Sequence, residues 1–383
     1  MKVLHAIGAG LRRALGPALR RRLQRKRHNR YREAFGRNGL LRDPPDPRYV
    51  NDVRAFWAAH YGEAIHPFWH IACANATGKV DVRYIPTDIW FEDVLPFFNR
   101  MDMREAYIDK NLADLILGDP AAPRTVIRRI HGEYYDHGHG WIDRNAVPGM
   151  ILDGGPEQII KPSLTDNGVG IRSLQAGPEG IRMDGAPATL EALEQSHGAD
   201  FIIQARIRQH ATMAEPHPDS VNTVRLLTFR WGGEIRSLLA FARFGVGGKL
   251  TDNAGTGGVC CGIDADGRLH ATAVDEHGAL HSRHPTTGYD FGQRASVPNF
   301  DEIRSRGMAL HRRLPHFDLV SWDFAVGEDA EPVFVEFNLR GAVYIYQFAC
   351  GSPVFGDLTQ DVLERIRDSG GTRFASGRVI GPA

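Results

Sequence analysis

The feature that most constrains the fold is a change of sequence pattern near Thr125. Before it, apolar and aromatic residues recur at helical spacing, most clearly over residues 51–61 and 91–117. After it, short runs rich in β-branched and aromatic residues predict strands at residues 126–127, 157–161, 170–174, 201–207, 223–230, 235–243 and 332–337. Helical spacing returns at residues 190–196, 299–312 and 356–368. Strand pairs with intervening helices predict an α+β fold whose lobes contain antiparallel sheets, behind a mainly helical N-terminal region.

Length and composition fit a globular chain of this class. With 383 residues, the chain is long enough for two or three packed lobes. No apolar run reaches about 18 residues, so the sequence predicts no membrane-spanning helix. The cysteines are Cys73, Cys260, Cys261 and Cys350, and none forms a C-x-x-C pair. This argues against a zinc ribbon or a disulfide framework and favours a reducing, cytoplasmic location.

The first 42 residues form a basic arm on an acidic body. They carry 13 Lys and Arg side chains and one acid, Glu33, whereas the rest of the chain carries 33 basic and 45 acidic side chains. Apolar residues recur at helical spacing at Leu4, Ile7, Leu11, Leu15, Leu19 and Leu23. Such a helix can lie on an anionic membrane, which would place the protein at the inner membrane surface. The helix can equally pack on the body of the protein or remain a free arm. A transit peptide is a less favoured interpretation of the same residues. No nucleic-acid partner is expected.

A polar hairpin surrounds Lys161. One predicted strand ends in the lysine, a segment containing Gly168 and Gly170 follows, and a second strand leaves it. Glycines let backbone N–H groups approach a phosphate closely, and the lysine adds a positive charge. The residue order differs from that of a Walker loop. The motif fits a phosphate-binding hairpin, and it fits equally well a surface hairpin with an exposed lysine.

Hard oxygen ligands gather near the C-terminal end of the chain. Glu336 and Asn338 lie two residues apart on a predicted strand, so their side chains point to the same face. Asp323 precedes this strand, beyond an intervening turn. Carboxylate and amide oxygens suit magnesium when waters and substrate phosphates complete the site. Because the polar residues interrupt an apolar run, a metal site is favoured over a solvent-facing edge strand.

Two arginines lie on consecutive predicted strands between these motifs. Arg225 lies on the first strand and Arg243 ends the second. Asp252 and Asn253 then precede a glycine-rich turn at residues 255–258. The planar guanidinium group binds anionic oxygens in pairs, although a single arginine more often forms a surface ion pair.

Taken in order, these motifs resemble the ATP-grasp superfamily, most specifically its α-L-glutamate-ligase-related branch associated with sugar transfer. The ordered signature comprises Lys161 with its glycine hairpin, Gln204, Asn222-x-x-Arg225, Arg243, Asp252-Asn253, Gly257-Gly258, Asp323 and Glu336-x-Asn338. The resemblance covers roughly residues 106–350, and the full order is far more specific than any single piece.

The resemblance implies a role for individual positions. The implied nucleotide-binding residues are Lys110, Lys161, Gly168, Gln204, Ala205, Ile207 and Asn222. The implied catalytic residues, which would grip the γ-phosphate and acyl-phosphate oxygens, are Arg225, Arg243 and Asn253. The implied ligands of two magnesium ions are Asp323, Glu336 and Asn338. The sequence departs from the family pattern at Ala205, where an acid is usual, and this departure leaves the adenine and ribose contacts open.

The resemblance also implies a division of the chain. Residues 1–45 would form the basic arm and a proline-rich linker, and residues 46–105 the helical region. Residues 106–205 would form the nucleotide lobe, residues 206–370 the C-terminal lobe with the metal site, and residues 371–383 a tail.

The implied activity is an ATP- and magnesium-dependent ligation of a small-molecule carboxylate to an amine through an acyl-phosphate. Association with sugar transfer makes a glycan or sugar precursor a candidate acceptor, by analogy alone. One alternative is a kinase that stops at phosphoryl transfer. Another is a non-catalytic nucleotide-binding partner in polysaccharide assembly, which the intact Lys161, Asp323, Glu336 and Asn338 disfavour.

Other chemistry-bearing residues are assigned smaller roles. The glycine-rich segment holding His131, His137 and His139 is interpreted as a loose loop over the nucleotide phosphates, because no fourth zinc ligand is evident. Cys260 and Cys261 lack a partner base and are expected in the core. No G-x-S-x-G elbow supports a serine nucleophile. Three histidines are expected near the acceptor, namely His210, His217 and His284.

Overall fold

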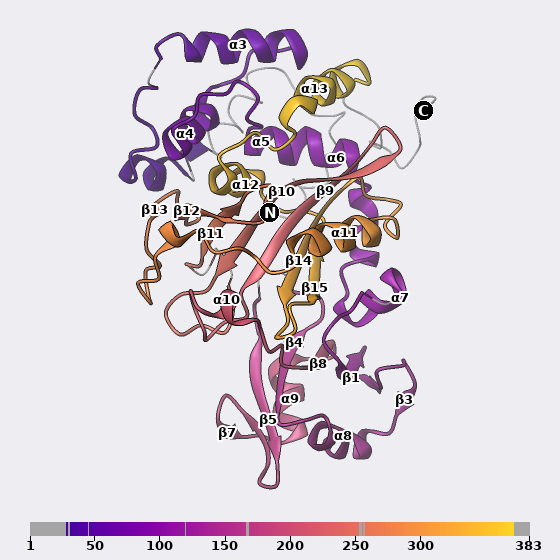
Figure 1. The fold of residues 1–383 in the computed structure, drawn as a ribbon. Coiled ribbons are helices and arrows are strands. Elements are labelled where there is room, and N and C mark those ends of the chain that lie inside the picture. The colour runs from indigo at the N-terminus through magenta and orange to yellow at the C-terminus, as the bar shows by residue number, and fades with distance from the viewer. Residues whose placement is uncertain are drawn as a thin grey trace.

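The computed structural model describes residues 28–29, 31–44, 46–118, 120–165, 168–252, 255 and 257–370. Most of the predicted basic arm, Asn253 and the tail at residues 371–383 lie outside the described residues. Figure 1 shows the smaller first lobe at the bottom, the larger second lobe above it, and a layer of helices at the top. The predicted α+β class with two antiparallel sheets is confirmed.

The first lobe is an antiparallel sheet of eight described strands in the order β3-β2-β1-β8-β4-β5-β6-β7. The strands are β1 (Thr125–Ile130), β2 (Glu133–Tyr135), β3 (Trp141–Ile142), β4 (Glu157–Pro162), β5 (Arg172–Gly177), β6 (Gly180–Met183), β7 (Ala186–Pro187) and β8 (Phe201–Ala205). Helices α8 (Val147–Asp153) and α9 (Leu190–His197) belong to the same lobe. Ile151 and Leu193 from these helices join Ile160 of β4 in one buried cluster. Because side chains alternate along a strand, Ile159 and Lys161 point to the opposite face.

The histidine-containing segment of this lobe is a pair of hairpins rather than the loose loop predicted. His131 and Gly132 connect β1 to β2 with φ values of 51° and 89°, as a tight two-residue hairpin turn requires. Asp136 then folds the connection to β3, because its carboxylate accepts 2.8 Å hydrogen bonds from the backbones of Gly138 and Gly140.

The second lobe is an antiparallel sheet of seven described strands in the order β13-β12-β11-β10-β9-β14-β15. The strands are β9 (Thr223–Trp231), β10 (Glu234–Phe244), β11 (Val259–Ile263), β12 (Leu269–Val274), β13 (Leu280–His281), β14 (Leu319–Val326) and β15 (Pro332–Asn338). Its other elements are α10 (Ala211–Ala214), η7 (Phe291–Gln293), α11 (Phe300–His311), α12 (Val343–Cys350), η8 (Gly356–Leu358) and α13 (Thr359–Asp368). One apolar cluster joins Ile303 and Leu310 of α11 to Leu226 and Phe324 of the sheet.

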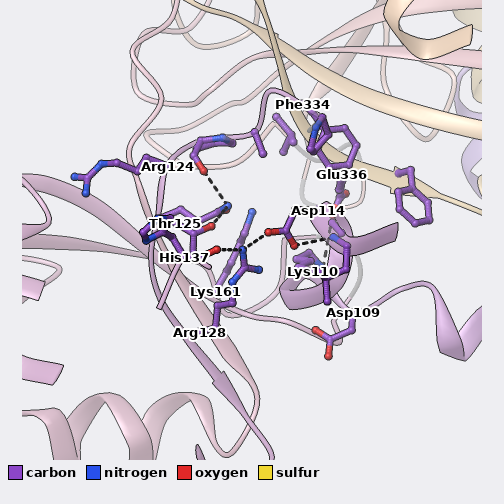
Figure 2. A pocket seen from close by; sticks show the side chains of 18 of the residues that line it. Asp109, Lys110, Asp114, Arg124, Thr125, Arg128, His137, Lys161, Phe334 and Glu336 are labelled. Carbon is purple, nitrogen blue, oxygen red and sulfur yellow. Dashed lines mark hydrogen bonds and ion pairs between the residues drawn. The ribbon is translucent and has the colours of Figure 1, made fainter. Parts of the chain in front are cut away.

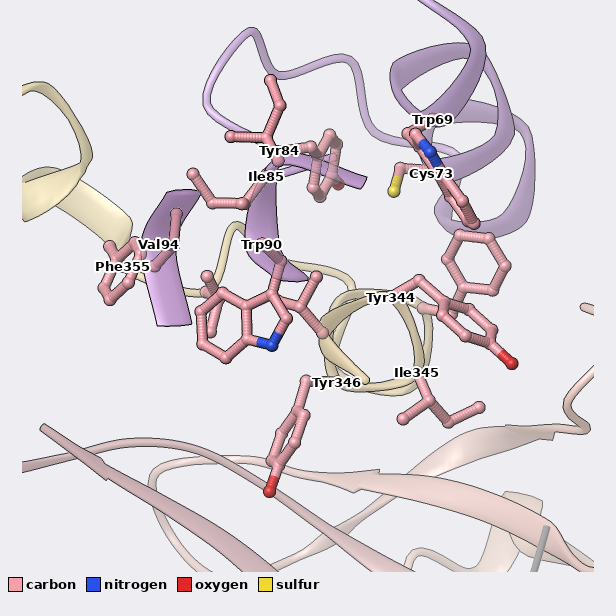
Figure 3. Close-up of a cluster of buried hydrophobic side chains, with 14 of the residues drawn as sticks. Trp69, Cys73, Tyr84, Ile85, Trp90, Val94, Tyr344, Ile345, Tyr346 and Phe355 are labelled. Carbon is pink, nitrogen blue, oxygen red and sulfur yellow. The ribbon is translucent and has the colours of Figure 1, made fainter. Parts of the chain in front are cut away.

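The first N-terminal helices cover the other face of this sheet. They are α3 (Tyr49–His60), α4 (Phe68–Thr77), α5 (Thr87–Ile89), η2 (Trp90–Val94) and α6 (Leu95–Phe98). The elements that follow are η3 (Met101–Ala106), η4 (Lys110–Leu112) and α7 (Ala113–Leu117), and Met103, Ala113 and Leu117 pack against the same apolar cluster as α11. Figure 3 shows Trp69, Trp90 and Tyr346 gathered around α12, between the N-terminal helices and the sheet. None of the helices in the described ranges combines the length and apolar character needed to span a bilayer.

Residues 91–117, where apolar residues recur at helical spacing, form several short helical elements and not one helix. Asn99 adopts an extended conformation, with φ −117° and ψ 134°. Its side chain accepts hydrogen bonds from the backbones of Asp318 and Leu319 and donates one to the carbonyl of Leu319. The helix therefore ends where Asn99 joins the sheet, and the chain continues through short turns that carry Lys110 to the space between the lobes.

Candidate functional site

The two sheets enclose two adjoining cavities. The first, of about 500 Å³, lies between β1 and β8 of the first lobe and α7 and β15 (Figure 2). The second, of about 120 Å³, lies between the β4–β5 hairpin and strands β9 and β10. The walls that both cavities share are formed by Lys110, Pro123, Lys161, Val335 and Glu336. The lysines and the glutamate predicted from separate motifs therefore meet at one place.

Lys161 is a buried cation. It lies on β4 opposite Ile202 of β8, and Ile202 lies opposite Arg128 of β1, so one row of the sheet carries two cations. Lys161 is 5% exposed, and within the described ranges its ammonium has no hydrogen-bond acceptor or ion-pair partner. Burial lowers the pKa of Lys161 to about 8; Lys110 lowers it further and Glu336 opposes the change. A buried ammonium without an acceptor creates a strong demand for an anion.

Lys110 reaches the same place from the turn η4. Its backbone N–H donates 3.1 Å to the carbonyl of Ser163, and its ammonium donates to the carbonyl of Thr165 in the hairpin after β4. The ammonium also lies 3.8 Å from Oε2 of Glu336. Lys110 therefore connects the phosphate-type hairpin of the first lobe to the acidic strand of the second.

Arg128 holds the segment that carries Lys110. Arg128 is 3% exposed, and its guanidinium donates to the carbonyl of Asn111 and, at 2.5 Å, to Oδ2 of Asp114. His139 lies 3.1 Å from the other oxygen of Asp114. Arg128 and Asp114 were not predicted, because residues so far from the signature motifs give no sequence signal of this contact.

One row of the second sheet brings together the predicted arginine and the predicted acids. Asp323 on β14 lies directly opposite Arg225 of β9 on one side and Glu336 of β15 on the other. Nε and NH2 of Arg225 donate to the two oxygens of Asp323 at 2.7 and 2.6 Å. Burial of Asp323 opposes its ionisation, yet the charges of Arg225 and Arg243 hold its pKa below the usual value.

Arg243 lies between two buried carboxylates. Its NH2 is 3.2 Å from Oδ1 of Asp252 and 3.2 Å from Oδ2 of Asp323. Its guanidinium also donates to the hydroxyl of Thr223, at 3.0 Å from Nε and 2.9 Å from NH2. Burial raises the pKa of Asp252, against the influence of Arg243. Thr223 was not predicted, and its position two residues before Arg225 on the same strand is the signal that could have found it.

Asn338 lies beside the two carboxylates of Glu336 and Asp323. Its amide nitrogen lies 3.3 Å from Oε1 of Glu336 and 3.4 Å from Oδ2 of Asp323. The described residues include no group of three or more His, Cys, Asp and Glu side chains arranged to hold a metal ion. Two carboxylates and an amide oxygen nevertheless fit magnesium, which needs few protein ligands when phosphates supply the rest.

With this geometry established, comparison with known proteins identifies the family. The family model for sugar-transfer associated ATP-grasp proteins matches residues 130–362, which is more than half of the chain. The chain belongs to this family. The resemblance read from the sequence is thereby confirmed, and the two-lobed architecture is the ATP-grasp fold.

Three solved structures with distant similarity are ligases. The VanG D-Ala:D-Ser ligase from Enterococcus faecalis is 12% identical, with 68% of this chain and 61% of that chain covered and a TM-score of 0.40. The ATP-grasp ligase PsnB is 13% identical, with 70% and 62% covered and a TM-score of 0.39. The D-alanine-D-alanine ligase from Coxiella burnetii is 11% identical, with 69% and 58% covered and a TM-score of 0.38. The chain thus spans about three fifths of these relatives. No curated protein sequence matches it.

The end of β8 and the residues after it border the two cavities. Gln204 is 6% exposed and lines the first cavity, where its amide donates at 3.3 Å to the carbonyl of Pro123. Ile207 lines the second cavity. Ala205 lines neither of them, and its backbone N–H donates 2.9 Å to the carbonyl of Arg124. The strand β8 ends at Ala205, two residues earlier than predicted.

The hairpin after β4 lies against the second lobe. Gly168 lines the second cavity with φ 67°, and a methyl group at its Cα would lie 3.2 Å from the side chain of Thr251. Glycine suits this position, because the left-handed conformation and the close approach both disfavour a larger residue.

Some predicted residues lie away from the cavities. Asn222 is fully buried, lines neither cavity, and donates 2.6 and 2.8 Å hydrogen bonds to the carbonyls of Met213 and His217. His217 and His284 pack ring to ring at 5.5 Å and are both buried. His210 caps α10. These residues support the loop before β9, whereas Asn253 lies outside the described residues.

Proposed function

We propose that the protein binds ATP and magnesium between its lobes and joins a carboxylate to an amine through an acyl-phosphate. The observation that carries this proposal is the buried ammonium of Lys161, which has no partner among the described residues and lies beside Lys110, with Glu336 across the cavity. Two neighbouring and largely buried cations attract a polyanion, and an acid on the opposite wall attracts the cation that accompanies it. Membership of the ATP-grasp family supports ATP as that polyanion.

In this proposal, residues 106–205 form the nucleotide lobe and residues 206–370 the C-terminal lobe. Lys161 and Lys110 would contact the α- and β-phosphates, and Gly168 would bring hairpin N–H groups close to them. The backbone of residues 203–207 would pair with adenine, with Gln204 and Ile207 on the adjoining walls. Asn222 would act indirectly, by holding the start of β9.

The second lobe would supply the reacting end of the site. Glu336, Asn338 and Asp323 would hold two magnesium ions, which neutralise the charge that develops on the transferring phosphoryl group. Arg225 and Arg243, with Asn253, would bind the γ-phosphate and the oxygens of the acyl-phosphate. Arg243 would be effective here because Thr223 and Asp252 orient its buried guanidinium group before charge develops.

The proposed chemistry has two steps. A carboxylate oxygen attacks the γ-phosphorus, the bond to the β,γ-bridging oxygen breaks, and ADP leaves. The amine nitrogen then attacks the carbonyl carbon of the acyl-phosphate, loses a proton, and displaces inorganic phosphate. The arginines lower the barrier by stabilising the crowded anions of both steps. The family's association with sugar transfer supports a sugar-linked acceptor.

The nucleotide site is tested by measuring the binding of a non-hydrolysable ATP analogue by calorimetry in the presence of magnesium. Lys161→Ala should weaken binding by about 2–4 kcal/mol, the range for losing a buried charged partner. Lys79→Ala is the matched control, because Lys79 is exposed and lines neither of the two cavities. Equal affinity of wild type and Lys161→Ala, with the fold intact, would refute the proposal.

A substrate screen tests the reaction. Candidate carboxylates, amino acids and sugar-linked amines are combined in pairs, and ADP release is measured with either partner omitted. A ligase releases ADP and forms an amide only when both partners are present. ADP release with a phosphorylated product and no need for an amine would indicate a kinase instead.

A further inference from the structure

Arg225 and Asp323 form an ion pair with two hydrogen bonds. Both oxygens of Asp323 accept from the guanidinium of Arg225, at 2.7 and 2.6 Å. Oδ2 is also approached by NH2 of Arg243 at 3.2 Å and by Nδ2 of Asn338 at 3.4 Å. The side chain of Asp323 is 0% exposed. A divalent cation that used Asp323 would therefore have to displace the guanidinium group of Arg225.

The two partners differ in their freedom to move. Asp323 has a short side chain on β14, a strand whose described residues are all buried. The side chain of Arg225 is 17% exposed and lines the second cavity. A long arginine can turn its guanidinium toward the cavity, whereas the aspartate stays where the sheet places it. Any exchange of partners at this pair must therefore begin with movement of Arg225.

The surrounding charges make such an exchange costly for either ligand alone. Within the described ranges, Asp252 and Asp323 are paired with arginines, and Glu336 lies 3.8 Å from Lys110. A cation at Asp323 alone would leave Arg225 unpaired beside another positive charge. An anion that drew Arg225 away alone would leave Asp323 as a buried, uncompensated carboxylate. Both penalties disappear when the cation and the anion arrive together.

We infer that Arg225 and Asp323 form an exchange pair, which makes binding of a divalent cation and binding of an oxyanion at this site depend on each other. When both are bound, Asp323 pairs with the cation and Arg225 with the oxyanion. Because linkage is reciprocal, each ligand tightens the other by the same factor. The inference rests on the proposed function, and it adds that Asp323 is closed to metal until an oxyanion releases it.

The exchange is tested without turnover by titrating the protein with Mn²⁺ and measuring the free ion by electron paramagnetic resonance. Wild type should bind Mn²⁺ weakly alone and much more tightly with a non-hydrolysable ATP analogue. Arg225→Met removes the guanidinium and keeps an unbranched side chain, so it should tighten nucleotide-free Mn²⁺ binding by about tenfold or more, because a buried ion pair no longer has to be broken. Arg225→Lys, which keeps the charge but not the paired hydrogen bonds, should fall between them.

The control is Arg206→Met. Arg206 lines the same cavity, but its ion pair is with Glu157 at 3.7 Å, away from Asp323. Removing this charge should change Mn²⁺ affinity by less than about threefold, as expected for a screened, part-exposed cation. A similar tightening in both methionine variants would show a general charge effect and would overturn the exchange.

Two outcomes separate this inference from the proposed function. If wild type binds the Mn²⁺–nucleotide complex but Arg225→Met leaves nucleotide-free Mn²⁺ affinity unchanged, the exchange pair is overturned and the proposed function stands. If wild type binds no nucleotide under any condition, the proposed function itself fails. Should Arg225→Met not fold, Asp323→Asn provides the second measurement: it should reduce the factor by which nucleotide and Mn²⁺ tighten each other, and an unchanged factor would overturn the exchange.

Discussion

The backbone N–H and the hydroxyl of Thr223 both donate to the same oxygen, Oδ2, of Asp252. The other oxygen of Asp252 faces Arg243 at 3.2 Å, and Arg243 in turn donates to the hydroxyl of Thr223. These three side chains form a closed set at the start of β9 and the end of β10. Asp252 therefore fixes the direction in which Arg243 presents its remaining donors.

From this arrangement we predict that Asp252→Asn lowers turnover more than nucleotide affinity. The amide keeps its shape but loses the charge that holds Arg243, so kcat should fall by about 10- to 100-fold, less than the loss expected for removing a donor outright. The affinity for ADP should change by less than about threefold, because the lysines are untouched. Steady-state kinetics and calorimetry measure the two quantities, and Asp219→Asn, which removes an exposed carboxylate from the same cavity, is the control.

Nucleotide binding should depend on pH through Lys161. Burial lowers the pKa of Lys161 to about 8. Below that pH the side chain is an ammonium and attracts phosphates, whereas above it the neutral amine does not. Affinity should therefore fall as pH rises through about 8, and binding near that pH should take up protons, because the bound phosphates raise the pKa of Lys161. Calorimetry in two buffers of different ionisation enthalpy measures the uptake.

Lys161→Arg separates this titration from other pH effects. Arginine stays charged throughout this range, so the variant should bind nucleotide with an affinity that is nearly independent of pH between about 7 and about 9. A wild-type protein whose affinity is equally flat over that range would show that Lys161 does not titrate at the site.

Glu336 and Asn338 give a third prediction. Glu336→Gln keeps the shape of the side chain but removes its charge, so the protein should fold normally and lose about 100-fold or more of its ATP-dependent turnover. Asn338→Asp should be milder, because it keeps an oxygen in place. Kinetics at several magnesium concentrations and thermal melting distinguish loss of metal from loss of fold.

The control for this pair is Glu328→Gln, which changes an exposed acid in the β14–β15 turn. It should leave both turnover and melting temperature near wild type. A Glu336→Gln variant with wild-type magnesium dependence and turnover would remove Glu336 from the metal site.

The sequence predicts the parts of the site that depend on local pattern. The period of two along β15 places Glu336 and Asn338 on one face, and in the structure Nδ2 of Asn338 lies 3.3 Å from Oε1 of Glu336. The strand that ends at Lys161 and the order of the motifs likewise follow from pattern alone. Such features are readable because each depends on a few neighbouring residues.

The remaining features depend on contacts between distant segments. Arg225 and Asp323 are 98 residues apart, and only the sheet register makes them partners. Asn99 ends a segment with helical spacing because it bonds to β14, more than 200 residues away. Asn222 fits the family signature, yet its side chain turns into the protein and not toward the cavities. Tertiary hydrogen bonds decide each of these, and a single sequence does not display them.

The last prediction concerns the basic arm, which lies mostly outside the described residues. Its leucine stripe and its 13 basic residues within the first 42 suggest binding to anionic lipid. The test compares the full chain with a chain lacking residues 1–26. The cut precedes His28, because His28 is 3% exposed and stacks on Phe68 at a ring distance of 4.4 Å, so a longer deletion would disturb the body.

The full chain should co-sediment with vesicles containing anionic lipid, and the shortened chain should not. Binding should weaken as salt rises, because screening reduces the attraction between the basic residues and the lipid headgroups. Vesicles of neutral lipid are the control, and both proteins should melt at similar temperatures and bind nucleotide alike. Equal sedimentation of the two chains would assign the arm a different role, since the charge that distinguishes them would then contribute nothing to the membrane contact.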